Sequence, residues 1–384
     1  MLLYDWMVSD FFCEEFVVIK NNKSISVMFV SALSLVALVA ATPEASAGSI
    51  KQAGKLDLEV GGQVVRGIAN VDDGRSNQIF IPDGLDNDTE FYFAASGKLT
   101  EQMTAGLALT FDATQSGAQY SFDADGDETV ADDAEAIAEQ FVYFEHTELG
   151  TISLGFTGHG GDGANDQVFG QTISTNGGYA RQITLIDSDG AQSAITAADQ
   201  LSDLDPEDDN LIRYDSPSVA GFALGLSFDD EGDSSVGLFY AASVGDIEIN
   251  AAGHFLNEET GDGQSTYGGS IAAMHSSGFH VAFANGLRRA EGSGRKPHTN
   301  RYHIGYETQL NSLGKTDFYG TYRDSEDIEA AGREGEEFIF GITQELESIG
   351  GYAALAYSQT SYSDSTATVY EDVDVLYLET SVAF

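Results

Sequence analysis

Apolar and polar residues alternate in short segments along most of the chain, and this alternation limits the fold more than any other feature. In DVDVLYLETSVAF, residues 372–384, one face of the segment carries Leu376, Leu378, Val382 and Phe384, while the residues between them form a mixed face. Successive side chains of a β-strand point to opposite faces, so this segment predicts a strand. Soluble two-sheet sandwiches and membrane barrels both contain strands of this kind.

The same pattern recurs in sixteen segments that are separated by turn-forming residues. The predicted strands cover residues 53–68, 88–99, 103–115, 138–147, 151–158, 209–216, 221–230, 235–243, 246–256, 265–274, 278–287, 300–309, 315–324, 335–345, 351–362 and 373–384. No convincing stretch has the period of an amphipathic helix. The sequence therefore predicts an all-β protein.

The connections between these segments alternate in length. Short turns are predicted at 99–102, 148–150, 218–221, 244–246, 275–278, 310–315 and 347–351, and longer acidic links include 69–87, 116–137 and 159–208. Outer-membrane barrels have tight turns at one rim and long loops at the other. A sandwich has no reason to sort its connections in this way.

The apolar faces of the segments form short rows, such as Leu107, Leu109 and Phe111, while Gly, Ser, Thr and charged residues recur on the opposite faces. The alternative for these rows is the core of a soluble β-protein, but the polar faces then lack a filled interior. A strand crosses the hydrocarbon layer with roughly 9 to 11 tilted residues. Only a closed sheet pairs every backbone group there. We therefore predict a sixteen-stranded antiparallel transmembrane β-barrel with short periplasmic turns and long external loops.

The amino-terminal part of the chain predicts export. An apolar run at 25–41 follows two lysines and precedes an Ala-Ser-Ala triplet at 45–47, which is the layout of a secretory signal peptide. Residues 1–47 are predicted to be this signal, and residues 48–384 the barrel. Residues 1–16 are unusual for a signal peptide, so we expect translation to start near Val17 or Val18.

The chain is strongly acidic, with 62 Asp and Glu against 17 Lys and Arg and a formal charge of −45. Loss of residues 1–47 removes five acids and two lysines, which leaves −42, and it also removes Cys13, the only cysteine. The mature chain can then form neither disulfides nor cysteine-ligated metal sites. Because it has no basic excess, it is not expected to bind nucleic acid. Cations are better partners.

Three patches of sequence resemble the general diffusion porins of Gram-negative outer membranes, particularly the alphaproteobacterial type. They are FVYFEHTELGTISLGFTGHGGDGAND (141–166), NLIRYDSPSVAGFALGLSF (210–228) and YLETSVAF (377–384). In layout the resemblance extends over residues 48–384. It implies a sixteen-stranded barrel in the outer membrane, assembled as a homotrimer, whose third loop folds inward to narrow the channel.

The resemblance also implies roles for particular residues. The apolar row of the last segment, Leu376, Leu378, Val382 and Phe384, resembles the carboxy-terminal signal that the barrel-assembly machinery reads. In the family, carboxylates on the third loop face basic side chains of the barrel wall. The third loop here corresponds to residues 159–208, a length that is uncommon in a compact domain unless the loop is functional.

The acidic candidates on this loop are Asp162, Asp166, Asp187, Asp189, Asp199, Asp203 and Asp205. The basic wall candidates, chosen by strand parity, are Lys55, Lys98, Arg213, Arg301 and Arg323, and Arg66 joins them only if Gly61-Gly62 forms a bulge. Rings of acids favour cations, so we expect a cation-preferring pore. The alternative for any one of these acids is a solvated loop carboxylate.

A second acidic stretch, DADGDETVADD at 123–133, is a weak candidate for a calcium site. Its acids at Asp123, Asp125, Asp127, Asp132 and Asp133 could gather oxygens around Ca²⁺, but it lacks the glycine and the final glutamate of an EF-hand loop. One hypothesis is an external ion that bridges lipopolysaccharide. The other is a hydrated acidic surface.

The seven histidines show no metal spacing and no nucleophile motif, so neither catalysis nor a cofactor is expected. The sequence predicts a water-filled channel in outer-membrane lipid for passive diffusion of small hydrophilic solutes and ions. The near alternative is a substrate-selective channel, which needs a lumenal track of aromatics beyond the inward Tyr92, Tyr319 and Tyr377. The distant alternative is a secreted β-protein that binds calcium or glycans.

Overall fold

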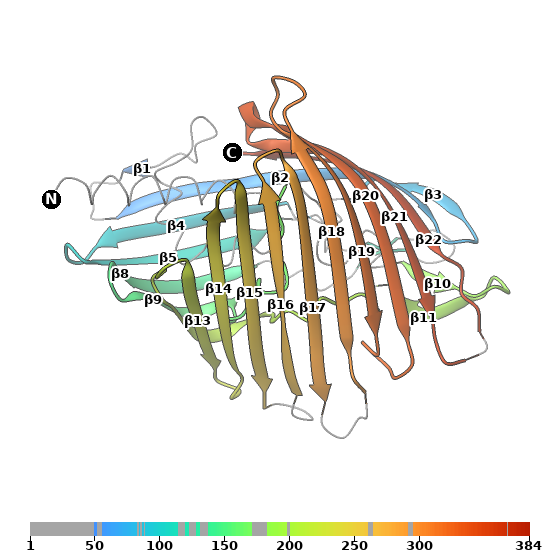
Figure 1. The fold of residues 1–384 in the computed structure, drawn as a ribbon, viewed down its shortest axis with the longest axis horizontal. Coiled ribbons are helices and arrows are strands. Elements are labelled where there is room, and N and C mark those ends of the chain that lie inside the picture. Colours follow the sequence, from blue (N-terminus) through green and yellow to red (C-terminus); the bar gives the residue numbers. More distant parts are fainter. Residues whose placement is uncertain are drawn as a thin grey trace.

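The computed structural model describes residues 50–51, 56–82, 84, 87, 89–113, 120–122, 128–130, 137–170, 183–197, 200–259, 264–290, 295–366 and 368–384. Within these residues, sixteen antiparallel strands form a closed barrel (Figure 1). They are β2 (Asp57–Asp72), β4 (Glu90–Lys98), β5 (Met103–Asp112), β8 (Glu139–His146), β9 (Gly150–Gly158), β12 (Asp208–Asp215), β13 (Phe222–Asp229), β14 (Ser234–Val244), β15 (Ile247–Glu258), β16 (Gln264–His275), β17 (Phe279–Ala290), β18 (His298–Thr308), β19 (Thr316–Glu326), β20 (Glu334–Leu346), β21 (Gly351–Ser363) and β22 (Val373–Ala383).

Several short elements accompany the barrel. Two of them extend its sheet, β1 (Ile50–Lys51) and β3 (Asn77–Phe80), and both pair with β2. Two separate hairpins form from β6 (Tyr120–Phe122) with β7 (Glu128–Val130) and from β10 (Thr184–Ile186) with β11 (Gln192–Thr196), and a 3₁₀ turn covers Glu347–Ile349. In the described residues, no helix is both long and apolar enough to cross a membrane.

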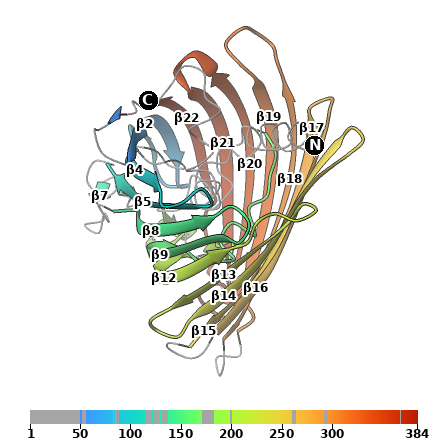
Figure 2. The ribbon, with the colours of Figure 1, turned by 90° about the vertical axis from the view of Figure 1, so that its left-hand side faces the viewer.

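The barrel closes where the first long strand meets the last. The sheet curves round until β22 lies beside β2, as Figure 2 shows, with a register that runs from Gln63↔Ala383 to Asp72↔Asp374. Gly62 and Phe384 exchange backbone hydrogen bonds of 3.1 and 3.0 Å at the end of this seam. The other edge of β2 pairs with β4 in its first half and with β3 in its second half. Both edges of β2 are therefore hydrogen-bonded along most of its length.

Each of the sixteen predicted segments coincides with one strand of the barrel. The largest displacement is in the first strand, which was predicted at 53–68 and runs from Asp57 to Asp72. Its last residues, Ala69–Asp72, pair with both β22 and β3, so partners on two sides hold a polar stretch extended. Local residue type alone predicted a loop there.

The connections follow the predicted asymmetry. The links 99–102, 147–149, 245–246 and 276–278 make one rim of tight turns, and the links 73–89, 113–138 and 159–207 lie at the opposite rim. We call these the short-turn rim and the long-loop rim. The later links at the long-loop rim are short, as at 230–233. The asymmetry therefore comes from the first three long connections.

The outward face of the barrel is apolar. Leu376 and Leu378 of β22 are 49% and 48% exposed, and Phe340 of β20 is 60% exposed. A row of directly paired aromatic residues, Tyr302, Tyr322 and Phe338, crosses β18 to β20, with ring centroids 6.2 and 4.5 Å apart. Exposed apolar strand faces with aromatic rows are typical of a surface that contacts hydrocarbon and its interface.

Substitution on the two faces of one strand tests this assignment. Leu238 of β14 is 50% exposed on the outward face, and Ala241 of the same strand points inward. A charge on the lipid side costs about 2 to 4 kcal/mol near mid-membrane, whereas lumen positions tolerate it. Leu238→Arg is therefore expected to lower the free energy of unfolding in lipid vesicles by about that amount. Ala241→Arg should leave it nearly unchanged, and equal losses for both variants would contradict the assignment.

Candidate constriction site

The third loop, residues 159–207, joins β9 to β12, and its described parts lie against the inner wall of the barrel. The backbone N–H groups of Gly160 and Gly161 donate to the hydroxyls of Ser227 (2.9 Å) and Ser235 (3.1 Å) on β13 and β14. Farther along, the Ser270 hydroxyl of β16 donates to the carbonyl of Ala164 at 2.6 Å. The start of the loop therefore crosses successive strands of the wall.

A row of small residues on the wall lets the loop approach so closely. Gly225 and Gly237 are direct cross-strand partners on β13 and β14, and Gly268 and Gly286 are partners on β16 and β17. A Cβ at Gly225 would lie 2.1 Å from the carbonyl oxygen of Gly160, and one at Gly286 would lie 2.4 Å from that of Asp203. A larger residue at Gly225, Gly237 or Gly286 would displace the loop, because the contact at these three positions is with loop backbone.

The second part of the loop packs on an apolar patch of the opposite wall. Ile183, Leu185 and Ala197, in and beside the β10–β11 hairpin, are buried in one cluster with inward residues of β2 and β19 to β22, including Val71 and Val375. The hairpin also pairs with the link between β21 and β22 through the backbone, where Ser188 N–H donates to the Val369 carbonyl at 2.8 Å. Burial of these side chains holds the loop inside the barrel.

Two of the predicted wall arginines lie beside loop carboxylates or loop backbone. Arg301 of β18 donates to the Asp166 carboxylate and to the Asn165 carbonyl, both at 2.7 Å. Arg323 of β19 is the direct cross-strand partner of Arg301 and is 2% exposed. Two adjacent guanidinium groups therefore point inward where the loop crosses the wall.

Arg213 of β12 also points inward, but it pairs with its own strand. Its Nε lies 3.0 Å from the carboxylate of Asp215, and its Nη1 donates to the Gly158 carbonyl at 3.0 Å. The side chain is almost fully buried, at 1% exposure. It therefore links the base of the third loop to the wall.

The loop carboxylates that gather at this place are Asp162, Asp166, Asp203 and Asp205. Asp205 accepts the backbone N–H groups of Gly163 (2.5 Å) and Asn165 (3.0 Å), which closes the turn that presents Asp166 to Arg301. The Asp203 carbonyl accepts the Asn165 amide at 2.8 Å. Two parts of the loop separated by about forty residues are thus joined by hydrogen bonds between 163–165 and 203–205.

Burial changes the ionisation of these carboxyl groups. It raises the pKa of Asp166 to about 7, although Arg301 acts in the opposite direction. Burial also raises the pKa of Asp162 well above its usual range, and the nearby Asp208 raises it further. The pKa of Asp205 is raised in the same way by burial and by the neighbouring Asp166 and Asp162. The negative charge of the loop therefore changes near neutral pH.

The other predicted acids and bases lie elsewhere. Asp187 Oδ1 accepts the backbone N–H groups of Asp189 (3.0 Å) and Ala191 (2.8 Å). This oxygen therefore stabilises the turn of the β10–β11 hairpin and is not paired with a wall arginine. Lys98 points inward by parity but is exposed beside the short turn 99–102. Lys55, Asp199 and the acids of the calcium hypothesis, Asp123, Asp125, Asp127, Asp132 and Asp133, lie outside the described residues.

The conditional placement of Arg66 in the inner wall was wrong. The pairing of β2 with β4 runs without a shift from Asp57↔Ser96 to Gln63↔Glu90, so Gly61 and Gly62 form no bulge. Arg66 therefore shares the outward face of its strand with Val64 and Ile68, and it is exposed. Its Nη1 donates to the Val65 carbonyl (2.7 Å) and to the Thr89 hydroxyl (3.0 Å).

Sequence reasoning also missed inward residues. Arg288 lies beyond the predicted end of its strand at 287, but β17 continues to Ala290, and Arg288 donates inward to the Thr266 hydroxyl at 3.3 Å. The histidines show no metal spacing along the sequence, yet a nitrogen of His280 lies 3.3 Å from one of His303, and His280 Nε2 lies 3.0 Å from the Asp317 carboxylate. The sequence signal for this buried group was that His280 and His303 occupy inward positions in the alternation of β17 and β18.

Comparison with known proteins agrees with this architecture. The family model of the Gram-negative porins matches residues 32–375. No curated protein matches the sequence. Among solved structures, OmpT of Vibrio cholerae in its trimer form aligns with TM-score 0.58 and 12% identity over 86% of this chain and 100% of that chain. The anion-selective porin from Comamonas acidovorans aligns with TM-score 0.57 and 13% identity over 86% and 100%.

A third structure, the outer membrane channel DcaP of Acinetobacter baumannii, aligns with TM-score 0.56 and 10% identity over 88% of this chain and 100% of that chain. At such identities the structural likeness shows the fold alone. The family match covers most of the sequence, including fifteen of the sixteen barrel strands in full and the first residues of β22. The chain therefore belongs to the Gram-negative porins, a family of outer-membrane barrels.

Proposed function

We propose that this porin forms a water-filled, cation-preferring channel through which small hydrophilic solutes and ions diffuse passively across the outer membrane. The observation that carries the proposal is the charge of the inward face. Among the described strands, the inward bases are Lys98, Arg213, Arg288, Arg301 and Arg323. The inward acids include Asp57, Glu59, Glu90, Asp112, Glu139, Glu145, Asp209, Asp215, Asp229, Glu248, Glu258, Glu307, Asp317, Glu337 and Glu379.

The excess of inward carboxylates attracts cations and lowers the local concentration of anions. The third loop adds Asp162, Asp166, Asp203 and Asp205 where it crosses the wall beside Arg301 and Arg323. Opposed charges at a wet constriction create a field that orients water and polar solutes. Selection then depends on solute size and on charge, without a reaction or a cofactor.

The fold by itself does not decide the selectivity. The structurally similar porin from Comamonas acidovorans is described as anion-selective, so barrels of one architecture differ in their preference. Preference must come from the charges of each chain. This chain carries 62 acids and 17 bases, which favours cations.

A substrate-selective channel is the weaker candidate. Such a channel needs aromatic side chains exposed along the lumen, and several tyrosines do point inward on β8, β19, β21 and β22. However, Tyr143, Tyr319, Tyr352 and Tyr377 are buried within the described structure, at 5% exposure or less. They pack against the wall and the third loop, so they offer no continuous surface to a passing solute.

The proposal includes the cellular context that the sequence predicts. We infer a homotrimer, in line with the trimer form named for the Vibrio cholerae structure, and the alphaproteobacterial type from the three resembling patches. Export by residues 1–47 and insertion by the assembly machinery through the terminal row belong to the same proposal. In that row, Leu376, Leu378, Val382 and Phe384 are all exposed on the outward face. Contacts with lipopolysaccharide, including a calcium ion at 123–133, stay hypotheses.

Ion selectivity in a planar bilayer tests the proposal. In a KCl gradient the reversal potential of the purified protein should have the sign of K⁺ preference. One charge at 4 Å in water is worth ~1 kcal/mol, about fivefold in relative permeability. Arg301→Gln should raise the preference for K⁺ by up to about that factor. Lys98→Gln, a charge-matched control at the short-turn rim, should change it less. A silent bilayer would overturn the channel, and anion preference would overturn the selectivity.

The pH dependence of selectivity tests the role of the loop carboxylates. The pKa of Asp166 is raised to about 7 by burial, so this group is neutral below that pH and negative above it. Lowering the pH from 8 to 6 is therefore expected to weaken the K⁺ preference, and Asp166→Asn should reduce this change. Reversal potentials that stay constant over this range in the wild-type protein would contradict the assignment.

A further inference from the structure

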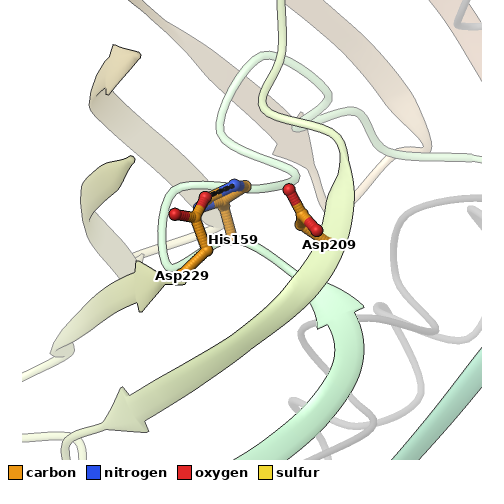
Figure 3. Close-up of side chains that lie close together, drawn as sticks. All are labelled: His159, Asp209 and Asp229. Atoms are coloured by element: carbon orange, nitrogen blue, oxygen red, sulfur yellow. Dashed lines mark ion pairs between the residues drawn. The ribbon is translucent and has the colours of Figure 1, made fainter. Parts of the chain in front are cut away.

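We propose that His159, Asp209 and Asp229 form a binding site for a divalent transition metal of the zinc class at the base of the third loop. These side chains come from the first residue of the loop, from β12 and from the end of β13 (Figure 3). One ligand atom from each lies within 4.8 Å of the other two. The site is separate from the acidic stretch at 123–133 and from the Asp166–Arg301 pair.

Strand pairing explains why residues far apart in the sequence meet here. Gly158, the end of β9, pairs with Asp208 of β12, and Leu211 of β12 pairs with Asp229 of β13. Asp209 and Asp229 both occupy inward positions near the long-loop rim, and His159 follows Gly158 directly. Three adjacent strands therefore direct their ends toward one point inside the barrel.

The carboxylate of Asp229 is prepared for a cation. Its Oδ1 accepts the backbone N–H groups of Glu231 (2.9 Å), Gly232 (2.8 Å) and Asp233 (2.8 Å). Its Oδ2 is buried without a hydrogen-bond partner and points toward His159 Nε2 at 4.0 Å, and the whole residue is only 2% exposed. Burial of an unpartnered carboxylate oxygen is costly, and a bound cation would offset this cost.

The imidazole of His159 is oriented for the same purpose. Its Nδ1 lies 2.8 Å from the hydroxyl of Ser227, which fixes the ring and leaves Nε2 facing Asp229. Metal-bound histidines commonly donate their second N–H to such a partner.

The donor set indicates the class of metal. One imidazole nitrogen with two carboxylates suits Zn²⁺, whose bonds to such ligands are about 2.0 to 2.2 Å. Calcium prefers six to eight oxygen ligands and has little affinity for imidazole. Asp209 is half-buried, so its side of the site is accessible from solvent.

A metal at this site would join both ends of the third loop. His159 begins the loop and Asp209 lies two residues past its end, where the β9–β12 ladder is continued by a long hydrogen bond of 3.4 Å from His159 N–H to the Glu207 carbonyl. Coordination would therefore hold the base of the loop against β13 and stabilise the folded barrel by preferential binding.

Calorimetric titration of zinc into the full-length protein tests the site. The protein should carry no polyhistidine tag, be refolded in detergent and be freed of metal with a chelator. We expect one high-affinity Zn²⁺ per chain. Its affinity should fall by at least about tenfold in His159→Gln and in Asp209→Asn. His275→Gln, which removes an exposed histidine from the end of β16 at the short-turn rim, should leave the affinity unchanged.

Asp229→Asn separates metal binding from folding. The asparagine keeps Oδ1 for the three backbone N–H groups and replaces only the oxygen that faces His159. We therefore expect the variant to unfold in SDS at the same temperature as the wild type, while its zinc affinity falls. X-ray absorption at the zinc edge should show one imidazole ligand. Unchanged affinity in His159→Gln, or displacement of zinc by an equal concentration of Ca²⁺, would show adventitious binding by surface acids and overturn the proposal.

Discussion

The structure depends on closure of the sheet between β2 and β22. Hydrocarbon offers no hydrogen-bond partners, so every backbone N–H and C=O group at that depth must pair within the protein. The seam from Gln63↔Ala383 to Asp72↔Asp374, completed by the exchange between Gly62 and Phe384, removes the last free edges. Closure then assigns the two faces of every strand, one toward lipid and one toward the interior.

The interior is organised by the third loop. Glycines at partner positions on the wall allow its backbone to lie directly on the strands, and serine hydroxyls of the wall accept or donate its first hydrogen bonds. The same loop buries Ile183 and Leu185 against the opposite wall. Loop carboxylates and wall arginines thus meet at positions set by packing on both sides, and their charge follows from burial as well as from residue type.

Much of the barrel could be predicted from the sequence because strand parity is a local property. The row from Leu376 to Phe384 and the inward placement of Arg301 and Arg323 follow from alternation alone. Arg66 depended on register, and without a bulge at Gly61–Gly62 it lies outside. The end of β2 at Asp72 depended on pairing with two neighbouring strands.

The candidate sites were less predictable because they depend on contacts between distant residues. Asp205 meets Gly163 through a fold of the loop that no local pattern encodes. His159 and Asp229 meet only because β9, β12 and β13 are adjacent, and His280 meets His303 across two strands. In each case the alternation along a strand predicts that the side chain points into the barrel. Which side chains of other strands lie beside it depends on the pairing of the strands.

Cysteine labelling along one strand tests the central claim, that water fills the inside and hydrocarbon covers the outside, most directly. The only native cysteine, Cys13, precedes the predicted mature chain, so single cysteines can be placed at each residue from Leu238 to Val244 of β14, beyond the part that the third loop covers. A charged, membrane-impermeant thiol reagent added to the protein in lipid vesicles should modify inward positions such as Ala241 and Ser243 and spare Leu238, Tyr240 and Ala242. Uniform labelling, or labelling of the outward set, would contradict the account.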